Sequence, residues 1–311
     1  RDTSKRIKVS TLRGMGLRED TVCKEIISSC VDLAASNAQD IRRQLDMVGV
    51  TLVDGFASFP DSGETTKLVV KKSKADTDFQ TINAKKVLIA TGSKPFLPPG
   101  IPFDGKRVFD SDSINTLSFL PKSIAITGSG IIAVEYARIF SNLGADVTLI
   151  IRDRVPRNAL MKIGLDKDVA ATLVAALIRS GIKIRKGAQV RSFQVPSTGD
   201  QDAGLRVPIT LKLEAPDRTD LSYDEVKCDV YLAAVGRKPN TGSLNLTPAG
   251  IGMDNYGGIL VNGQLQTTAS NVYAAGAVLG RPFLASTGVA QAQAASTFVF
   301  ESPAAQDCDE E

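Results

Sequence analysis

The stretch that decides the fold is KSIAITGSGIIAVEYARIFSNLGADVTLIIRDR, residues 122–154. Residues 123–127 form a short, mostly apolar run that predicts a buried strand, and residues 131–142 have helical periodicity. Residues 146–151 predict a second buried, β-branched strand. A G-x-G-x-x-A motif lies between the first strand and the helix. A strand–turn–helix–strand unit of about 30 residues around this motif predicts a dinucleotide-binding βαβ unit.

Three small residues have separate roles in this turn. Gly128 permits the tight turn, Gly130 lets the backbone approach a pyrophosphate, and Ala133 lets helix and strand pack closely. The helix N-terminus offers unpaired N–H groups and a partial positive charge to phosphate. The cofactor-binding residues predicted here are Gly128, Ser129, Gly130, Ile131 and Ile132. The alternative is an ordinary α/β crossover with a glycine turn.

The residues after the second strand bear on which nucleotide binds. Sites that prefer NAD carry Asp or Glu there, about 20 residues after the glycines. This sequence instead has Ile151 followed by Arg152, Asp153 and Arg154. Because guanidinium groups bind a 2′-phosphate and a carboxylate repels it, the arginines favour NADP(H) over NAD(H). Asp153 keeps open the alternative of a solvated loop of mixed charge.

Length and composition indicate an ordinary globular protein. A chain of 311 residues is long enough for about two domains. Its 43% hydrophobic and 23% charged content is typical, and a net charge of +3 gives no broad affinity for nucleic acid or membranes. The sequence has no apolar run of membrane-spanning length, and its first residues, RDTSKRIKVS, do not form a secretory signal. We therefore expect a soluble protein with no membrane span.

Cysteine and histidine usage limits the chemistry. The four cysteines, at positions 23, 30, 228 and 308, are too few and too scattered for a disulfide framework. This indicates a reducing intracellular compartment, the cytosol or an organelle. The chain has no histidine, which excludes Ser-His and Cys-His catalysis and removes the commonest metal ligand. We expect no catalytic side chain and no metal site, so any chemistry must come from a bound cofactor.

The remainder of the chain alternates strands with a few helices. Helices are predicted at 20–48, 166–180 and 285–299, the first with Gly49 as its C-cap. Strands are predicted at 51–59, 65–71, 85–90, 182–190, 205–213, 229–234 and 271–275. Residues 60–63 are typical of a turn, residues 196–204 are typical of a hairpin tip, and the tail after residue 300 is expected to be frayed.

Six sequence blocks resemble those of one known family. They are GFASF (55–59), VLIATGSKP (87–95), RVFDSDSI (107–114), GSGIIAVEYA (128–137), AAVGRKPNT (233–241) and NVYAAGAVLGRPFLAS (271–286). In this order and spacing, over residues 31–296, they resemble the pyridine nucleotide–disulfide oxidoreductases, which are two-dinucleotide-binding flavoproteins. The chain looks most like the soluble pyridine nucleotide transhydrogenase branch, with dihydrolipoamide dehydrogenase and glutathione reductase as related branches.

The resemblance implies an α/β fold in which a Rossmann-like NAD(P)-binding domain is inserted into an incomplete FAD-binding domain. Residues 1–115 and 244–300 would belong to the FAD-type domain, and residues 116–243 would bind the pyridine nucleotide. Residues 301–311 would form an acidic tail. The implied cofactors are NADP or NAD and, as a family expectation, FAD.

The resemblance also implies roles for residues outside the glycine turn. Glu135 would lie near the contact between nicotinamide and flavin, and Arg237 would close the crossing between the domains. The other implied cofactor-binding residues are Gly55 and Ala57 near the FAD adenine, Thr91 and Gly92 in the flavin domain, and Val190, Gly236, Gly276 and Ala277. Simpler explanations of these residues exist. Glu135 is then only an exposed helix residue, and Gly236 with Pro239 forms only a tight turn.

Several family features are absent from this sequence. The first FAD βαβ unit, the redox C-x-x-x-x-C helix and the C-terminal dimerisation domain are missing, so we expect either a truncated or a naturally short chain. The family's Gly-Asp, whose carboxylate meets the flavin, is replaced by Gly276-Ala277. Loss of that carboxylate should weaken flavin binding by about 1–3 kcal/mol.

Two functions follow. The first is an FAD-dependent NAD(P)H oxidoreductase, similar to the soluble transhydrogenases, with hydride transfer through flavin where flavin is bound. The second is a degenerate, inactive homologue that serves as a structural or nucleotide-sensing subunit of a larger assembly. In that case a protein partner or a second copy would cover the incomplete FAD domain. The missing segments and Ala277 favour the second function for this chain. The family resemblance favours the first function for its ancestry.

Overall fold

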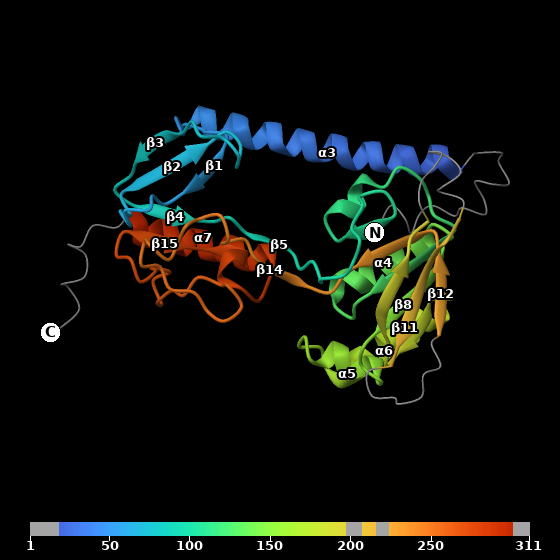
Figure 1. The fold of residues 1–311 in the computed structure, drawn as a ribbon. Helices are drawn as coiled ribbons and strands as arrows, with labels where there is room; N and C mark the ends of the chain where they lie inside the picture. The colour runs from blue at the N-terminus through green and yellow to red at the C-terminus, as the bar shows by residue number, and fades with distance from the viewer. Residues whose placement is uncertain (1–18, 197–206, 216–223, 301–311) are drawn as a thin grey trace. The chain divides into compact units, whose positions relative to one another are not determined.

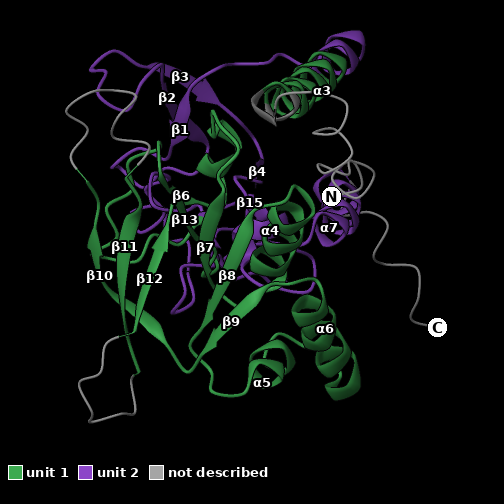
Figure 2. Ribbon diagram, turned by 90° about the vertical axis from the view of Figure 1, so that its right-hand side faces the viewer, with its two compact units in different colours: residues 1–41, 95–236 green, residues 42–94, 237–311 purple. Residues whose placement is uncertain are grey.

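The computed structural model describes residues 19–196, 207–215 and 224–300, which divide into two compact units (Figure 2). Unit 1 takes the described residues up to Ile41 and those of 95–236. Unit 2 takes residues 42–94 and the described residues from Arg237 onward. Residues 95–115, which the resemblance groups with the FAD-type domain, lie in unit 1.

Unit 1 is built on a five-stranded parallel sheet (Figure 1). The strand order is β6 (Val108–Asp110), β13 (Val230–Ala233), β7 (Ser123–Thr127), β8 (Asp146–Ile151) and β9 (Lys183–Lys186). The strands in the middle of the sheet are largely buried, and β13 is buried at every residue. Such continuous burial is expected for a parallel sheet that is covered on both faces.

Helices cover one face of this sheet. They are α4 (Ile131–Asn142), α5 (Pro156–Met161) and α6 (Lys167–Arg179), and the short helix η1 (Ser113–Thr116) follows β6. Ile124 and Ile126 of β7 point into this core, where they pack with Ala137 and Phe140 of α4 and with Leu177 of α6. The alternation of strand side chains therefore places every second residue of β7 under the helices.

A three-stranded antiparallel sheet covers the opposite face. Its order is β10 (Gln189–Gln194), β11 (Ile209–Glu214) and β12 (Glu225–Cys228). Ala125, Ile150 and Tyr231 point into this second core, against Ile209 and Leu211. Unit 1 therefore has three layers: helices, the parallel sheet and the antiparallel sheet.

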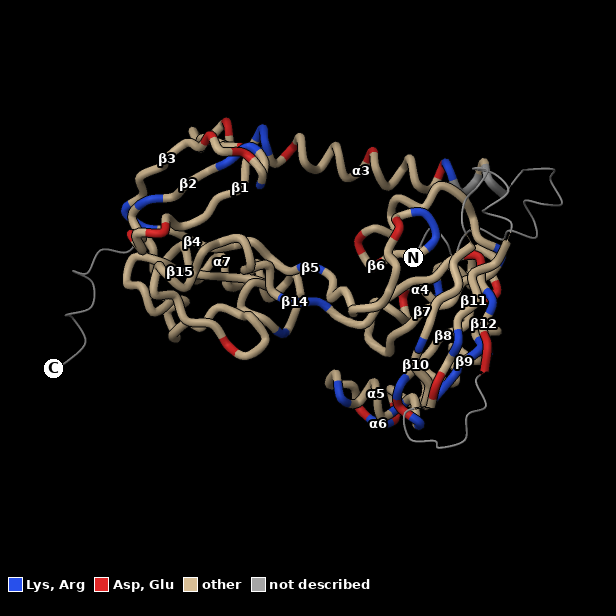
Figure 3. Tube along the Cα trace, viewed as in Figure 1, with Lys and Arg blue, Asp and Glu red and all other residues tan. Residues whose placement is uncertain are grey.

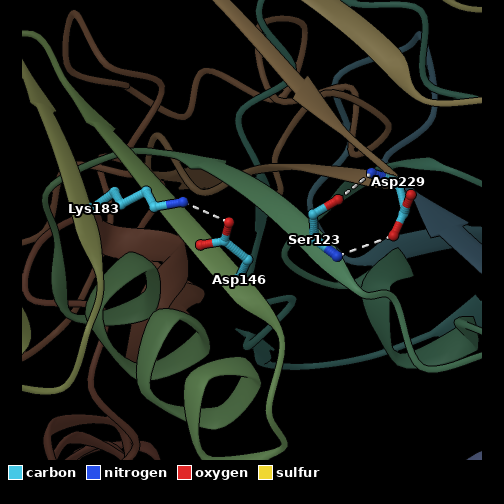
Figure 4. Close-up of polar contacts among 4 residues, drawn as sticks. All are labelled: Ser123, Asp146, Lys183 and Asp229. Atoms are coloured by element: carbon cyan, nitrogen blue, oxygen red, sulfur yellow. Dashed lines mark hydrogen bonds and ion pairs between the residues drawn. The ribbon is translucent and has the colours of Figure 1, made fainter.

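Polar contacts fix the register at one end of the parallel sheet (Figure 4). The Asp229 carboxylate, just before β13, accepts hydrogen bonds from the backbone N–H groups of Lys122 and Ser123 at 2.9 and 3.0 Å. The Asp229 N–H donates in return to the Ser123 hydroxyl at 3.1 Å. An exposed ion pair of 2.6 Å joins Lys183 of β9 to Asp146 of β8. Since exposed pairs contribute about 0–1 kcal/mol, the Asp229 contacts are the stronger register determinant.

Unit 2 combines two small sheets with a long C-terminal helix. The antiparallel sheet contains β1 (Phe56–Ser58), β2 (Lys67–Lys71) and β3 (Gln80–Asn83), and the parallel pair is β4 (Val87–Ile89) with β15 (Val272–Ala274). After β15 come η2 (Gly276–Leu279) and α7 (Ala285–Phe300). The hydrophobic core of unit 2 contains Phe59, Ile89, Leu246, Ile259 and Val272. The 16 residues of α7 include no charged side chain.

Two chain segments at the boundary of the units pair with each other. They are β5 (Ser93–Pro95) and β14 (Arg237–Pro239). The Arg237 guanidinium donates to the hydroxyl and the carbonyl oxygen of Ser93, both at 2.9 Å. Arg237 is the first residue of unit 2 after the chain leaves unit 1 at Gly236.

One long helix, α3 (Glu19–Met47), precedes these elements and spans 29 residues. Gly49 adopts φ +75°, and its N–H donates to the Asp46 carbonyl at 3.0 Å, so the predicted glycine C-cap is confirmed. Among the described residues, no helix is both long enough and apolar enough to span a membrane.

The most periodic predictions agree with the structure. The strand at 123–127, the helix at 131–142 and the strand at 146–151 are confirmed at their predicted bounds. The helices predicted at 20–48, 166–180 and 285–299 are confirmed to within one residue at each end.

Other predictions were wrong or incomplete. The strand predicted at 182–190 is two strands, because Gly187 adopts φ +65° and ends β9 before β10 begins. The strand predicted from residue 51 begins only at Phe56. The sequence did not predict β3, β5, β6, β12, β14 or α5. Residues 197–204 of the predicted hairpin tip and the tail from residue 301 lie outside the described residues.

We predict that the Asp166 side chain stabilises α6 more when it is ionised than when it is protonated. It caps the helix by accepting from the N–H groups of Asp168 and Val169 at 2.8 and 3.3 Å, and these bonds lower the pKa of Asp166. A lowered folded-state pKa means that the contribution is present above the ordinary pKa of about 4 and is lost as the pH falls. Asp166→Ala should lower the unfolding temperature at pH 7, and thermal unfolding measures this. Asp166→Asn retains the cap and should weaken the acid dependence.

Candidate nucleotide-binding site

The turn between β7 and α4 has a geometry that only glycine fits at its first position. Gly128 has φ +141°, and a Cβ atom there would lie 2.2 Å from the carbonyl oxygen of Ala234. The Gly128 N–H donates to the Ile150 carbonyl at 3.1 Å, and the Ala234 N–H donates to the Thr127 carbonyl at 2.8 Å. The turn is therefore held against the residues that end β8 and β13, at the carboxyl edge of the sheet.

Gly130 leaves the N-terminus of α4 open. A Cβ atom at Gly130 would have no protein atom within 4 Å, and the residue forms the N-cap without any side-chain hydrogen bond. The first helical N–H groups, from Ile131 onward, have no acceptor within the helix. No acidic residue lies in the first turn of α4. These N–H groups and the helix dipole suit an anion such as a pyrophosphate.

Ala133 is the third small residue of the G-x-G-x-x-A motif. Its side chain is fully buried in the core between α4 and the sheet, and its Cβ would lie 3.2 Å from a Cβ placed on Gly128. A larger residue at this position would separate the helix from the strand. Ala133 therefore allows α4 to pack closely on the sheet, whereas Gly130 leaves the N-terminus of α4 accessible to a ligand.

The loop after β8 carries charges beside this edge. Arg152 and Arg154 are exposed, and Asp153 between them is half-buried. The Asp153 carboxylate forms an ion pair with Lys162, which follows α5. Its carbonyl accepts a hydrogen bond from the Gly187 N–H at 3.0 Å. Lys162 therefore partly neutralises the one carboxylate that would repel a 2′-phosphate.

Gly187 is a further residue that shapes this loop. A Cβ atom at Gly187 would lie 3.1 Å from Cγ of Arg154, and the neighbouring Ala188 N–H donates to the Ile151 carbonyl at 3.2 Å. The turn between β9 and β10 thus supports the arginine loop from one side. Sequence reasoning missed both Gly187 and Lys162, because their contacts join positions with no shared motif.

The other residues predicted for this site are more widely spread. Gly236, with φ +119°, follows Ala234 by two residues and so lies close to the turn. Glu135 lines a groove of about 550 Å³ between α4 and α6, together with Arg138, Asp168 and others. Val190 is half-buried in β10, where it pairs with Leu213 and packs on the core beneath the parallel sheet. The structure does not bring Glu135 and Val190 together.

The strongly shifted titratable groups of unit 1 lie inside its core. Burial raises the pKa of the Cys228 thiol and of the Tyr231 phenol to about 12. Both groups are therefore neutral at physiological pH, and a buried neutral thiol is a poor nucleophile. Among the described residues, no cluster of acidic and cysteine side chains could hold a metal ion.

In unit 2, two pairs of predicted cofactor-binding residues lie at one sheet edge. Thr91 and Gly92 follow β4, Gly276 and Ala277 follow β15, and the Ala275 N–H donates to the Ile89 carbonyl at 3.0 Å. The carboxyl ends of these parallel strands are where ligands bind in open α/β sheets.

The polar groups at this edge are largely engaged within the chain. The Thr91 hydroxyl donates to the Asn240 carbonyl at 2.9 Å, and the Gly276 N–H donates to the Gln291 side chain at 2.8 Å. Ala277, in η2, offers no carboxylate. The described residues of this edge therefore do not fit FAD by themselves.

The remaining two predicted residues lie in β1 and just before it. A Cβ atom at Gly55 would lie 2.6 Å from Cγ1 of Val70 and 2.7 Å from the Lys71 carbonyl oxygen. Ala57 is exposed and pairs with Val70 in the sheet. The close approach to β2 is sufficient reason for the glycine at position 55.

Comparison with known proteins places the chain among nucleotide-dependent oxidoreductases. The family model described as pyridine nucleotide-disulphide oxidoreductase matches residues 30–295. The soluble pyridine nucleotide transhydrogenase of Colwellia psychrerythraea is 36% identical over 250 residues, which are 80% of this chain and 48% of that protein. That of Photobacterium profundum is 38% identical over 241 residues, 78% of this chain and 46% of that protein. The chain spans about half the length of the curated relatives it matches.

Solved structures agree with this assignment of the fold. LpdA from Mycobacterium tuberculosis matches with a TM-score of 0.75 over 95% of this chain and 60% of that chain, at 23% identity. A copper(II) complex of a mutant of the HOCl-induced flavoprotein disulfide reductase RclA from Escherichia coli matches with a TM-score of 0.70 at 26% identity. It covers 85% of this chain and 54% of that chain. The α/β fold with a Rossmann-like parallel sheet, predicted from the sequence, is confirmed.

Proposed function

This chain belongs to the pyridine nucleotide-disulphide oxidoreductase family, and on that premise we propose that it binds a pyridine nucleotide, with a preference for NADP(H), at the carboxyl edge of the unit 1 sheet. The turn at Gly128 and Gly130 takes the pyrophosphate. The loop at Arg152 and Arg154 takes the adenosine ribose with its 2′-phosphate. The observation that carries the proposal is the uncapped N-terminus of α4, with open space above Gly130.

The pyrophosphate assignment is supported by access and charge together. Gly130 presents main-chain atoms without a side chain above them, so a phosphate oxygen can reach the N–H groups of Ile131 and Ile132. Hydrogen bonds from N–H groups to an ionised acceptor contribute about 1.5–3 kcal/mol each. The positive end of the α4 dipole adds to this attraction.

The preference for NADP(H) is supported by the charge balance of the arginine loop. Asp153 could discriminate against a 2′-phosphate, but its carboxylate is ion-paired with Lys162. Arg152 and Arg154 are exposed on either side of it. A guanidinium can bind phosphate oxygens through two N–H groups at once, which is the geometry that a 2′-phosphate needs.

For the whole protein we propose an FAD-dependent NAD(P)H oxidoreductase similar to the soluble transhydrogenases. A bound flavin would supply the hydride-accepting group that the side chains of this chain lack. Since the described edge at Thr91 and Gly276 does not fit FAD by itself, this activity requires polar groups from outside the described residues. We also propose a reducing intracellular compartment, because Cys30 and Cys228 are both free thiols.

A second function is favoured by Ala277. This residue is the second of η2, at the sheet edge where the family carries a carboxylate for the flavin. The alternative is a catalytically inactive homologue that keeps nucleotide binding in unit 1 and serves as a sensing or structural subunit of an assembly.

Flavin absorbance separates the two functions. The purified protein is tested for a visible flavin spectrum and for NADPH-dependent reduction of an added acceptor. Yellow protein with turnover supports the oxidoreductase and removes the inactive alternative. Colourless protein that shows no flavin absorbance after incubation with FAD, yet binds NADPH, supports the alternative.

We predict that Arg152→Ala with Arg154→Ala weakens NADPH binding at least about tenfold, the equivalent of about 1.4 kcal/mol. NADH binding should change little, because only NADPH carries the 2′-phosphate. Isothermal titration with each nucleotide measures the ratio. Lys162→Ala should shift the ratio in the same direction, because it leaves the Asp153 carboxylate without its cation.

The matched control is Arg179→Ala, which removes an exposed arginine from the last turn of α6. It should leave both affinities unchanged. An unchanged NADPH-to-NADH ratio in the double variant would show that the arginine loop does not select NADP(H), while nucleotide binding itself could still stand.

A further inference from the structure

One turn of unit 2 begins with an asparagine followed by a glycine. Asn262 and Gly263 are both exposed, and the turn that they begin ends where the chain pairs with β15. Of all the asparagines in the sequence, Asn262 alone precedes a glycine. Asparagine is thermolabile, because the backbone nitrogen of the next residue can attack its side-chain amide. A glycine in the next position leaves that nitrogen unobstructed by a side chain.

The nitrogen that would attack is available. The Gly263 N–H donates no hydrogen bond within the described part of the chain. A Cβ atom at Gly263 would meet no protein atom within 4 Å, so the space beside the residue is open. In contrast, the N–H groups of Gln264, Leu265 and Gln266 all donate to Asn262. Gly263 is therefore the residue of this turn whose nitrogen is not engaged.

The amide that would be attacked is held in one orientation. Asn262 Oδ1 accepts from the N–H groups of Gln264 and Gln266, both at 3.0 Å, and Nδ2 donates to Oε1 of Gln266 at 3.2 Å. Gln266 Nε2 donates in turn to the Ser270 carbonyl at 2.7 Å. Attack at Cγ moves negative charge onto Oδ1. The two N–H donors stabilise that charge in the way that an oxyanion hole does.

The segment around the turn carries no charge that opposes this reaction. Residues 255–280 contain no Lys, Arg, Asp or Glu (Figure 3). No carboxylate of this segment therefore repels the negative charge that develops on Oδ1. A carboxylate formed at position 262 would be the first charge in the segment, which makes the product separable by ion exchange.

We propose that the folded chain modifies itself at Asn262, where the Gly263 nitrogen closes a succinimide ring on Asn262 Cγ. The N–Cγ bond forms, the Cγ–Nδ2 bond breaks, and Nδ2 leaves as ammonia with the proton of the Gly263 N–H. Solvent water then opens the ring. Opening at Cγ gives aspartate, whereas opening at the backbone carbonyl carbon gives isoaspartate, in which the chain runs through Cγ. This inference is independent of nucleotide binding in unit 1.

Isoaspartate would alter the contact between the turn and β15, because it adds the Cβ atom of residue 262 to the backbone. The turn is tightly defined: Leu265 adopts φ +58°, which is uncommon for a residue other than glycine. The Leu265 carbonyl accepts from the Ala274 N–H of β15 at 3.0 Å. A longer turn should displace this carbonyl, so the Ala274 N–H of the isoaspartate form should exchange with solvent faster than that of the unmodified chain.

Ion exchange and peptide mapping of the full chain test the proposal after incubation at mildly alkaline pH. A more acidic form should accumulate, its change in mass should map to Asn262, and an isoaspartate methyltransferase should label it. The matched control is Gly263→Ala, whose methyl group obstructs the attack but meets no protein atom within 4 Å. Since Gly263 is not among the glycines with positive φ, this variant should keep the wild-type unfolding temperature and lose most of the acidic form.

A parallel incubation in urea separates the folded turn from the reactivity of the dipeptide alone. Conversion of Asn262 in the folded chain supports the proposal. An intact Asn262 in the folded chain, with conversion in urea, would show that the turn protects the amide and overturns the proposal. Equal conversion of Gly263→Ala and the wild type would overturn the role of the Gly263 nitrogen.

Discussion

Replacement of Gly128 by alanine is expected to destabilise unit 1 by about 2–6 kcal/mol. Backbone strain at φ +141° accounts for about 1–3 kcal/mol. Overlap of the new Cβ with the Ala234 carbonyl oxygen, 2.2 Å away, adds about 1–3 kcal/mol. Chemical denaturation measures the free energy of unfolding, and nucleotide binding should be lost with the fold of the turn.

Gly130→Ala is the variant to compare with Gly128→Ala, because it should weaken nucleotide binding without lowering stability. Gly130 has φ −77°, which alanine adopts without strain, and its Cβ would meet no protein atom within 4 Å. Stability should therefore stay near that of the wild type. The methyl group would occupy the space proposed for the pyrophosphate and cost one or two charge-assisted hydrogen bonds. The Kd for NADPH should rise about ten- to a hundredfold. Unchanged binding in Gly130→Ala would contradict the proposed site.

Arg107→Met is expected to destabilise the protein by about 2–5 kcal/mol. Arg107 is 1% exposed, and its guanidinium donates to the Asp229 carbonyl at 3.1 Å and to the Val207 carbonyl at 2.6 Å. Methionine fills much of the volume but donates nothing, so buried carbonyl groups lose their donor at about 1–3 kcal/mol each.

The guanidinium joins the segment before β13 to the segment before β11. Its loss should therefore destabilise both the parallel and the antiparallel sheet of unit 1. Thermal and chemical unfolding measure the effect. Arg179→Met is the surface control and should lie within about 0.5 kcal/mol of the wild type. Equal stability of the two variants would mean that the buried guanidinium is replaceable by apolar packing, as some buried charges are.

Local periodicity explains which elements could be predicted from the sequence. Residues 122–154 carry their own strand and helix periods, and their bounds match β7, α4 and β8. In contrast, β5, β6 and β14 have three residues each, too few to show a period. They are strands because distant partners pair with them, such as Tyr231 of β13 with Val108 of β6.

The residues of the candidate site differ in the same way: some are predicted by a local motif, and others depend on contacts between distant segments. The role of Gly128 follows from the motif, because the turn is made by consecutive residues. The ion pair of Asp153 with Lys162 and the support of Arg154 by Gly187 depend on how helix and strand ends meet. Gly55 was predicted as an FAD contact, but its need for glycine is explained by Val70 in the neighbouring strand. A sequence block alone cannot separate such packing from ligand contact.

The position of β13 also sets the order in which unit 1 can be completed during translation. This strand lies between β6 and β7, although about a hundred residues of chain separate it from β7. A nascent chain that has not yet emerged beyond Ala233 has β6 and β7 without the strand that joins them. Their open edges are potential sites of wrong pairing until synthesis reaches β13. Folding of unit 1 is therefore expected to be late and dependent on long-range contacts.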